Sequence, residues 1–336
     1  MFSDNLRKML RGIAMSAFVV HNLELNGEGG ATSLPVSELP NVLPEEGCRW
    51  VHLDCREEEG YDWLCRLEGI PETAVEALYA EETRPRAVKM GNGLLLTLRG
   101  VNLNPESNPS DMVALRLWVT PHFIISSRRR KLLSVQDVVK DLANNEGPTN
   151  TGDIVATLTE TLTDRMSKVI TDLEDELADL EESIGEGVEA GQRDSLVQRR
   201  LETIRLRRFL VPQKEAINKL SQEALTWMTV DQIAQVQEAA NDITRYVEGL
   251  ESLRERCLLM QEEFANLQAE KMNARMYVLS ILSGIFMPLG FLTGLFGINI
   301  GGMPGTDNGS AFWLFCAVLV VLGGGQFLVM RKSRWF

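Results

Sequence analysis

The stretch YVLSILSGIFMPLGFLTGLF, residues Tyr277–Phe296, is a run of 20 residues without a charge. A second uncharged run of 20 residues, AFWLFCAVLVVLGGGQFLVM, follows at Ala311–Met330. A helix of about 20 apolar residues crosses the roughly 30 Å of hydrocarbon in a bilayer. Two such runs near the same end of the chain favour two membrane-spanning helices over a buried helix of a soluble protein.

The charges around these runs indicate how the helices cross the membrane. The link between them, Gly297–Ser310, has 14 residues, no Lys or Arg, and one acid, Asp307. Because positive charge stays on the cytoplasmic side, we expect both termini in the cytoplasm and the link outside. The basic residues that flank the outer ends of the pair are Lys271, Arg275, Arg331, Lys332 and Arg334.

The overall composition excludes several classes of protein. Of the 336 residues 44% are hydrophobic, which is enough apolar material for a folded core. The net charge of -13 argues against nucleic acid as a partner, because phosphate binding needs a basic surface. The five Cys, an odd number, do not make a disulfide framework. The sequence shows no Walker loop, nucleophile–His pair or Rossmann fingerprint, so we expect neither an enzyme nor a bound cofactor.

Residues 1–150 alternate strand-like and helix-like patterns and predict a cytoplasmic α/β domain. Gly91-Asn92-Gly93 is a turn signal and predicts a hairpin. The expected strands are Ala14–His21, Trp50–Asp54, Ala87–Met90, Leu94–Val101, Met112–Val119 and Phe123–Ser126. The expected helices are Asp62–Leu67, Pro71–Ala80 and Leu132–Asn144.

Residues 151–228 change to long helices with segregated charge. Residues 153–190 carry 12 acids and two bases, whereas residues 193–219 carry eight bases and three acids. One interpretation is an antiparallel helix pair whose opposite charges face each other or water. The other, compatible with the first, is that the acids draw divalent cations toward a pore mouth. The acids concerned are Asp172, Glu174, Asp175, Asp179, Glu181 and Glu182.

Residues 229–296 are expected to form one stalk helix that continues into the first span. Apolar residues recur at spacings of three and four from Ile233 to Leu267, a seam that calls for partner helices. No proline interrupts the pattern before Pro288. At the standard helical rise such a helix is ~100 Å long, which would connect the soluble part mechanically to the membrane.

One face of the first span carries small and polar residues with two methionines. This stripe consists of Asn273, Met276, Ser280, Gly284, Met287, Gly290 and Gly294. A chain with two spans cannot enclose a water-filled path, so a pore requires several copies that each contribute one wall helix. Small residues also favour close packing, so a packing stripe without a pore is the alternative.

The chemistry of the spans limits what could pass along them. Neither span contains Asp, Glu, Lys, Arg or His. A proton relay would need ionisable groups there, and a bare zinc ion would need Cys or His ligands along the wall. The wall therefore favours a hydrated cation contacted by amide, hydroxyl and backbone carbonyl oxygens.

The motif Gly297-Ile298-Asn299, directly after a span with Phe286-Met287-Pro288-Leu289, resembles the CorA-type divalent cation transporters. The signature of that family here is Gly-Met-Asn, so Ile298 is a departure. The substitution is similar to the zinc-transporting branch, ZntB. Other segments similar to that branch are Thr83-Arg84-Pro85-Arg86, Arg128-Arg129-Arg130-Lys131 and Gly147-Pro148-Thr149.

The resemblance implies a homopentamer with a funnel-shaped cytoplasmic domain and a pore lined by the stalk helix. Asn299 would ring the outer entrance and present side-chain carbonyls to the hydrated ion, with the backbone of Gly297 beside it. Met287 would form an apolar constriction, and Asn273 a polar ring at the inner end.

Two departures from the magnesium members weaken a magnesium interpretation. Gly290 takes a pore position where those members often carry Thr, so a hydroxyl ring is missing. Gly305 follows Met-Pro in the loop, where they commonly carry Glu, which leaves Asp307 as the loop's acid and a weaker candidate metal contact.

Two further clusters are candidate sites. Cys48, His52 and Cys55 would not converge on a metal if they lie on one strand, because Cys55 then points to the opposite face. Arg128–Lys131 is interpreted as a solvated or acid-paired cluster, with an anion site as the alternative.

These observations predict an α+β membrane protein with an N-terminal α/β/α domain, long stalk helices and two C-terminal spans. The divisions are residues 1–150, 151–228, 229–296, an external loop 297–310, a span 311–330 and a basic tail 331–336. The predicted function is a homopentameric divalent cation transporter of the bacterial inner membrane, with zinc preferred. Alternatives are a magnesium, cobalt or nickel channel of the same family, and a two-span coiled-coil signalling or scaffold protein.

Overall fold

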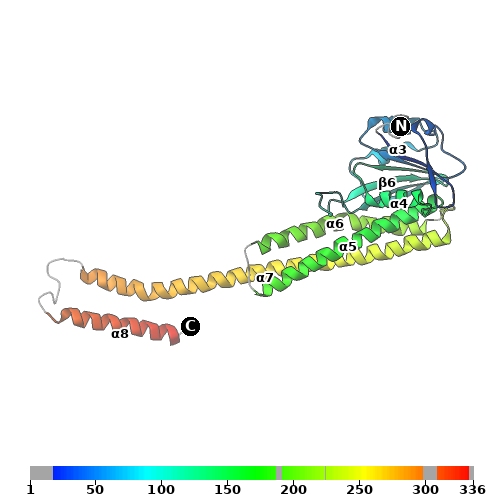
Figure 1. Cartoon of the computed structure of the whole chain (residues 1–336). Coiled ribbons are helices and arrows are strands. Elements are labelled where there is room, and N and C mark those ends of the chain that lie inside the picture. The colour runs from blue at the N-terminus through cyan, green and yellow to red at the C-terminus, as the bar shows by residue number, and fades with distance from the viewer. Residues whose placement is uncertain (1–17, 187–190, 224, 298–308, 333–336) are drawn as a thin grey trace, which may run out of the picture. The chain divides into compact units, whose positions relative to one another are not determined.

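The structure is a computed structural model that describes residues 18–186, 191–223, 225–297 and 309–332. The chain divides into two compact units, Met1–Gln261 and Glu262–Phe336 (Figure 1). The first unit contains a layered α/β domain and the long helices that pack on it. Among the described residues two helices are long and apolar enough to span a membrane, and the second unit contains one of them and the C-terminal part of the other.

The centre of the first unit is a seven-stranded sheet in the order β2-β1-β3-β7-β6-β5-β4. Only β3 and β7 are parallel, and the other described pairs are antiparallel. The hairpin predicted at Gly91-Asn92-Gly93 is confirmed, since β4 and β5 pair from Met90 and Gly93 outward. The strands are β1 (Val19–Leu25), β2 (Ala31–Ser33), β3 (Arg49–Asp54), β4 (Arg86–Met90), β5 (Gly93–Gly100), β6 (Val113–Val119) and β7 (Phe123–Arg128).

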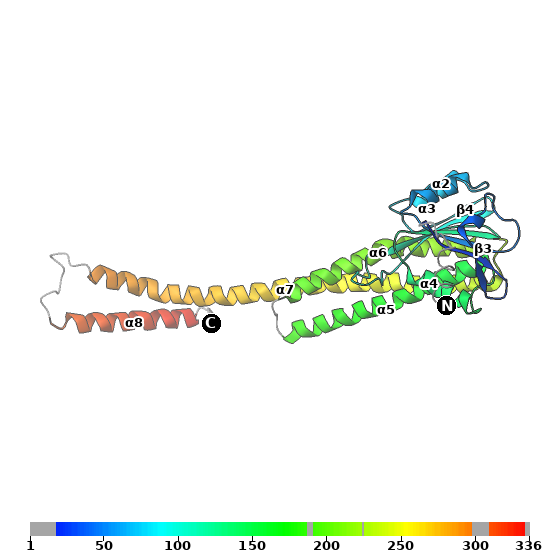
Figure 2. The same cartoon turned by 45° about the horizontal axis from the view of Figure 1, so that its top comes forward.

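Helices cover both faces of this sheet (Figure 2). On one face α2 (Glu58–Arg66) and α3 (Glu72–Tyr79) enclose a core that includes Trp63, Val51 and Phe123. On the other face lie α4 (Leu133–Ala143), α5 (Thr151–Glu186) and α6 (Gln192–Gln222), with α5 and α6 in contact with β5. β6 is buried along its whole length because both faces are covered. The predicted α/β/α layering is confirmed.

The charge-segregated helices form the predicted pair. α5 and α6 are in contact, and an ion pair of 2.9 Å joins Glu176 to Arg199 across them. Gly191 precedes α6 with a φ of 100°, a left-handed conformation that favours glycine. The continuous stalk helix is also confirmed, because α7 runs from Val230 to Gly297 over 68 residues.

Some local expectations were wrong or incomplete; α2, for example, begins at Glu58 and not at Asp62. The first strand is Val19–Leu25 rather than Ala14–His21, and residues 14–17 lie outside the described part. The polar residues Asn22 and Glu24 interrupt the apolar pattern, so the sequence did not indicate that the strand continues to Leu25. Asn22 is nevertheless buried, and its side-chain oxygen accepts a hydrogen bond from Arg49. The short β2 and the 3-10 helix Val36–Glu38 were missed because three residues are too few to show a periodicity.

The second unit contains the end of α7 and α8 (Ala311–Lys332). The phenyl rings of Phe296 and Phe315 lie 5.0 Å apart between their centroids, so the two helices touch near their connection. The most apolar windows of both helices are unburied in the single chain. That leaves large apolar side chains such as Met287 and Trp313 more than two-thirds exposed.

Candidate ion pathway

The stripe predicted from the sequence lies along one face of α7. All of its residues are exposed in the single chain, and Met276 and Met287 are 58% and 73% exposed. A Cβ atom added at Gly290 or Gly294 would meet nothing within 4 Å. The stripe is therefore an open face of the helix and not a contact within the described chain. Its members are Asn273, Met276, Ser280, Gly284, Met287, Gly290 and Gly294.

A different face of α7 packs on α8. A Cβ atom at Gly323 of α8 would lie 3.6 Å from the Cδ1 of Leu289. At about 100° per residue, the half-buried residues in the apolar part of α7, residues 277–296, point to one side, and the stripe is centred on the roughly opposite side. Those half-buried residues are Ile281, Ile285, Leu289 and Leu292. Since α8 covers one face, a second copy of the chain could approach α7 at the stripe.

Pro288 affects the backbone in the middle of the stripe. Proline has no N–H, so the carbonyl of Gly284 loses the donor that a helix normally supplies four residues later. The hydroxyl of Thr293 donates to the carbonyl of Gly290 over 3.0 Å. Gly284 itself lies on the same exposed face as Ser280 and Asn273, and a backbone carbonyl oxygen is the kind of ligand that suits a hydrated divalent cation.

The outer end of the candidate pathway is described only as far as Gly297, the last residue of α7, which is exposed. Ile298, Asn299 and Asp307, which the sequence predicts at the entrance, lie outside the described residues.

The predicted acidic residues divide into paired and unpaired groups. Glu181 binds Arg256 of α7 at 2.5 Å, in the same way that Glu176 binds Arg199. Those without an ion pair in the described part of the chain are Asp172, Glu174, Asp175, Asp179 and Glu182. Among described residues no three His, Cys, Asp or Glu side chains converge as metal ligands, so these acids do not assemble a coordination shell.

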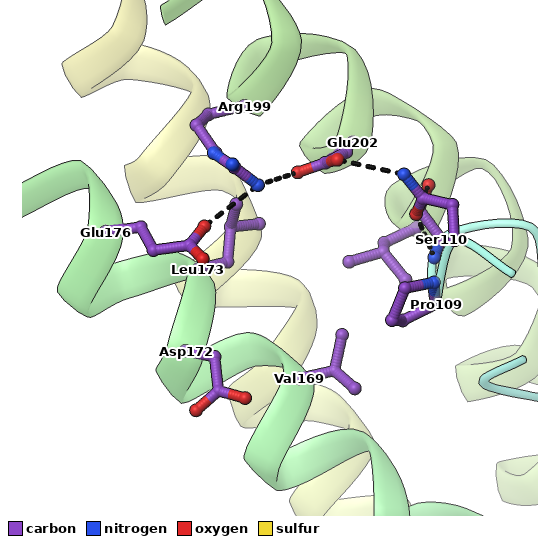
Figure 3. Close-up of a pocket in the computed structure, with 10 residues that line it drawn as sticks. Pro109, Ser110, Val169, Asp172, Leu173, Glu176, Arg199 and Glu202 are labelled. Atoms are coloured by element: carbon purple, nitrogen blue, oxygen red, sulfur yellow. Dashed lines mark hydrogen bonds and ion pairs between the residues drawn. The ribbon is translucent and has the colours of Figure 1, made fainter. Parts of the chain in front are cut away.

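A small pocket of about 180 Å³ shows what the charges of α5 and α6 do locally (Figure 3). The guanidinium of Arg199 bridges Glu176 at 2.9 Å and Glu202 at 2.7 Å. Glu202 also accepts a hydrogen bond of 3.0 Å from the amide of Asn108. This chain of contacts ties α5, α6 and the β5–β6 loop together. The sequence did not reveal it, because Asn108 and Glu202 are 94 residues apart.

In the cluster of Cys48, His52 and Cys55, which does not form a metal site among the described residues, His52 and Cys55 each have a separate hydrogen-bond partner. The Nδ1 of His52 lies 2.7 Å from the Oγ of Ser126, and the indole of Trp50 donates to the same oxygen. The thiol of Cys55 donates to the carbonyl of Arg128 over 3.3 Å. Burial, with Arg128 and His21 nearby, lowers the pKa of His52 well below its ordinary value.

Comparison with known proteins places this arrangement in a family. The family described as CorA-like Mg2+ transporter protein matches residues 45–332. The zinc transport protein ZntB of Pectobacterium carotovorum is 38% identical over 316 residues, which cover 94% of this chain and 95% of the relative. The divalent cation transporter CmaX of Pseudomonas aeruginosa is 38% identical over 325 residues, covering 94% and 96%.

A solved structure supports the same relationship. The structure of the full-length CmaX protein matches with a TM-score of 0.83 and 36% identity, and covers 95% of this chain and 98% of that chain. The match includes the layered domain and the long helices described above. With nearly the whole length aligned in sequence and in fold, this chain belongs to the family of CorA-like Mg2+ transporter proteins.

Proposed function

We propose that this protein transports zinc and other divalent cations across a membrane. Two relatives that align along nearly their whole length are named a zinc transport protein and a divalent cation transporter. The observation that carries the proposal to this chain is the exposed stripe of α7 on the side turned away from α8. The stripe supplies oxygen atoms and small residues but no charge, which suits an ion that keeps its hydration shell.

The pathway in this proposal is built from several copies of the chain. Two helices have no interior, so the stripes of neighbouring copies must face a common axis. We infer a homopentamer with a funnel formed by the helices of residues 151–228 and 229–296. Residues 1–150 form the cytoplasmic domain, and residues 311–330 face lipid.

Each part of the stripe has a proposed role. Asn299 and Gly297 contact the hydrated ion at the outer entrance, next to Ile298, and Asn273 forms a polar ring at the inner end. Met287, beside Pro288, is an apolar constriction. The carbonyl of Gly284 offers a hydrogen-bond acceptor between the Asn273 ring and the Met287 constriction, because Pro288 has no N–H to donate to it.

The proposed location is the inner membrane of a bacterium, with both termini in the cytoplasm and residues 297–310 outside. The distribution of Lys and Arg supports this orientation, since the loop between the spans has neither. The unpaired acids Asp172, Asp175 and Asp179 would raise the cation concentration near the inner mouth through their summed field.

Magnesium is the second candidate cargo, because the matching family is described by that ion. Ile298, Gly290 and Gly305 depart from the pattern that the resemblance implies for the magnesium members. These departures favour zinc.

The test is uptake into vesicles that contain the reconstituted protein and a zinc-sensitive dye. Zinc should enter above the rate of empty vesicles, and magnesium added in excess should compete weakly. Asn299→Ala should abolish uptake while the oligomer stays intact by size-exclusion chromatography. Gly294→Leu should also abolish uptake, because a bulky side chain then narrows the path.

Gly324→Leu is the matched control. Gly324 of α8, like Gly294 of α7, has nothing within 4 Å of an added Cβ atom, so both substitutions add the same bulk to an open helix face. Uptake should survive in the control. Equal loss in both variants, or equal survival, would contradict the assignment of the stripe to the pathway. No zinc entry with the unmodified protein would contradict the transport proposal itself.

A further inference from the structure

A pocket of about 480 Å³ in the first unit is lined by an unusual number of arginines. It lies between the end of β5, the start of β6, α6 and the segment after β7. Glu81 and Asp111 are its two acids. We call it the arginine pocket, after Arg99, Arg116, Arg129, Arg130, Arg205 and Arg208.

The sheet leaves room for the pocket because two neighbouring strands end at different levels. β7 ends at Arg128, and its pairing with β6 extends only to Arg116 opposite Ser127. The first residues of β6, from Val113, continue past that point with β5 alone on one side. The open edge faces the segment of Arg129 and Arg130.

Arg116 is a buried cation in the lining of this pocket. It is 2% exposed, yet its hydrogen bonds go only to neutral groups, including the carbonyl of Ala80 at 2.7 Å. The Nη1 lies 4.0 Å from the Sγ of Cys55. Its buried Nε has no hydrogen-bond partner in the described part of the chain. A buried charge is normally paired with an opposite charge, and Arg116 is not.

Arg99 shows the same imbalance. Its guanidinium donates to the carbonyls of Thr83 and Met112, each at 2.8 Å, and lies 4.0 Å over the ring of Phe209. None of these partners carries a negative charge. Burial, together with the charges of Arg116 and Arg208, lowers the pKa of Arg99 to about 10. The charged form of the Arg99 guanidinium is therefore destabilised by its surroundings in the pocket.

The two acids do not neutralise the pocket. Glu81 is 83% exposed and pairs with Arg129 at 3.1 Å, and the Nε of Arg129 is left buried without a partner in the described residues. Asp111 is 55% exposed and lies 3.5 Å from Arg205. No ion pair of Arg130 or Arg208 is found in the described ranges, so positive charge is in excess.

We propose that the arginine pocket binds a phosphate oligoanion, either a nucleoside polyphosphate or an inorganic polyphosphate. Guanidinium groups bind phosphate oxygens through two parallel N–H donors, and several arginines around one space suit several phosphates. The volume lies in the range of small-molecule sites, far above the roughly 30 Å³ that one water occupies. This site is independent of the proposed ion pathway.

Isothermal titration of the full-length protein in detergent tests the proposal, with tripolyphosphate, ATP, sulfate and chloride at matched ionic strength. We expect tripolyphosphate to bind at least tenfold more tightly than sulfate, and chloride not to compete. Equal affinities for ATP and tripolyphosphate would assign recognition to the phosphates alone, whereas tighter ATP binding would identify a nucleotide. Binding of neither, or equal competition by chloride, would overturn the proposal.

Surface arginines provide variants that leave the fold in place. Arg130→Gln and Arg208→Gln, both at exposed positions, should each weaken tripolyphosphate binding by roughly tenfold, since each removes charge-assisted hydrogen bonds. Arg66→Gln on α2 is the control, because Arg66 is equally exposed and does not line the pocket. Thermal unfolding checks that all three variants are folded. Equal affinity in the pocket variants and the control would overturn the assignment to this pocket.

Discussion

Replacing Gln213 by Met should loosen the attachment of α6 to the sheet. Gln213 is fully buried, and its side chain makes two hydrogen bonds with the backbone of Arg99. The N–H of Arg99 donates to Oε1 over 2.7 Å, and Nε2 donates to the Arg99 carbonyl over 3.0 Å. β4 pairs with β5 only as far as Arg86 opposite Thr97. The amide of Gln213 therefore takes the place of a missing neighbouring strand.

The expected loss in the free energy of unfolding follows from these two hydrogen bonds. Met has a similar volume but no donor or acceptor to replace the amide. Leaving a buried hydrogen-bonding group without a partner costs about 1–3 kcal/mol, so two groups give an upper range of about 6 kcal/mol. Arg99 is half-buried, so water can reach part of the site. We expect a loss near 2–3 kcal/mol in the free energy of unfolding, or roughly 5–10 °C in the melting temperature of the first unit.

Two measurements on the full-length protein in detergent check this expectation. Near-UV circular dichroism follows the melting of the first unit. Hydrogen exchange of the Arg99 amide reports the broken bond directly and should accelerate at least tenfold. Gln222→Met is the control, because Gln222 is exposed at the end of the same helix. If both variants melt together and the Arg99 amide keeps its protection, Gln213 does not hold the edge of β5.

Two other predictions concern pH and cation supply. Burial lowers the pKa of His52 and keeps the imidazole neutral in the folded state. Below about pH 6.5 only the unfolded chain therefore takes up this proton. The free energy of unfolding should then fall by up to about 1.4 kcal/mol per pH unit of acidification. His52→Gln should reduce the dependence of the melting temperature on pH between pH 7.5 and 5.5, and an unchanged slope would contradict this. A triple Asp→Asn variant should slow the initial zinc uptake several-fold at low ionic strength and not at high salt, because screening removes a distant field. A rate independent of the variant at low salt would show that these acids do not gather the cation. The three acids are Asp172, Asp175 and Asp179.

The site could be predicted as far as its local pattern extends. The stripe from Asn273 to Gly294 follows helical spacing, so its common face was readable before the structure. The direction in which that face points could not be predicted, because it depends on the packing of Leu289 on Gly323. For the acidic helix, the pattern predicted both pairing and free charge. Only the structure distinguishes Glu176, which binds Arg199, from Asp172, which has no ion pair in the described part.

The arginine pocket could not be predicted from the sequence, because its arginines come from distant segments. Arg129 and Arg130 stood out as a basic run, and an anion site was one interpretation of it. Nothing near them in the sequence indicated Arg99, Arg116 or Arg208, which come from two other strands and a helix. The unpaired charge of Arg116 appears only when these segments are brought together.

By itself the sequence determined the two uncharged helices that are long enough to span a membrane, from their length and lack of charge alone. It also determined the hairpin at Gly91-Asn92-Gly93 and the 68-residue helix α7. These features depend on neighbours within a few turns, so local composition is sufficient. Only the tertiary structure decided the parallel pairing of β3 with β7 and the capping of β5 by Gln213, 114 residues from Arg99. Contacts between such distant segments depend on which surfaces meet after folding, and no local periodicity records them.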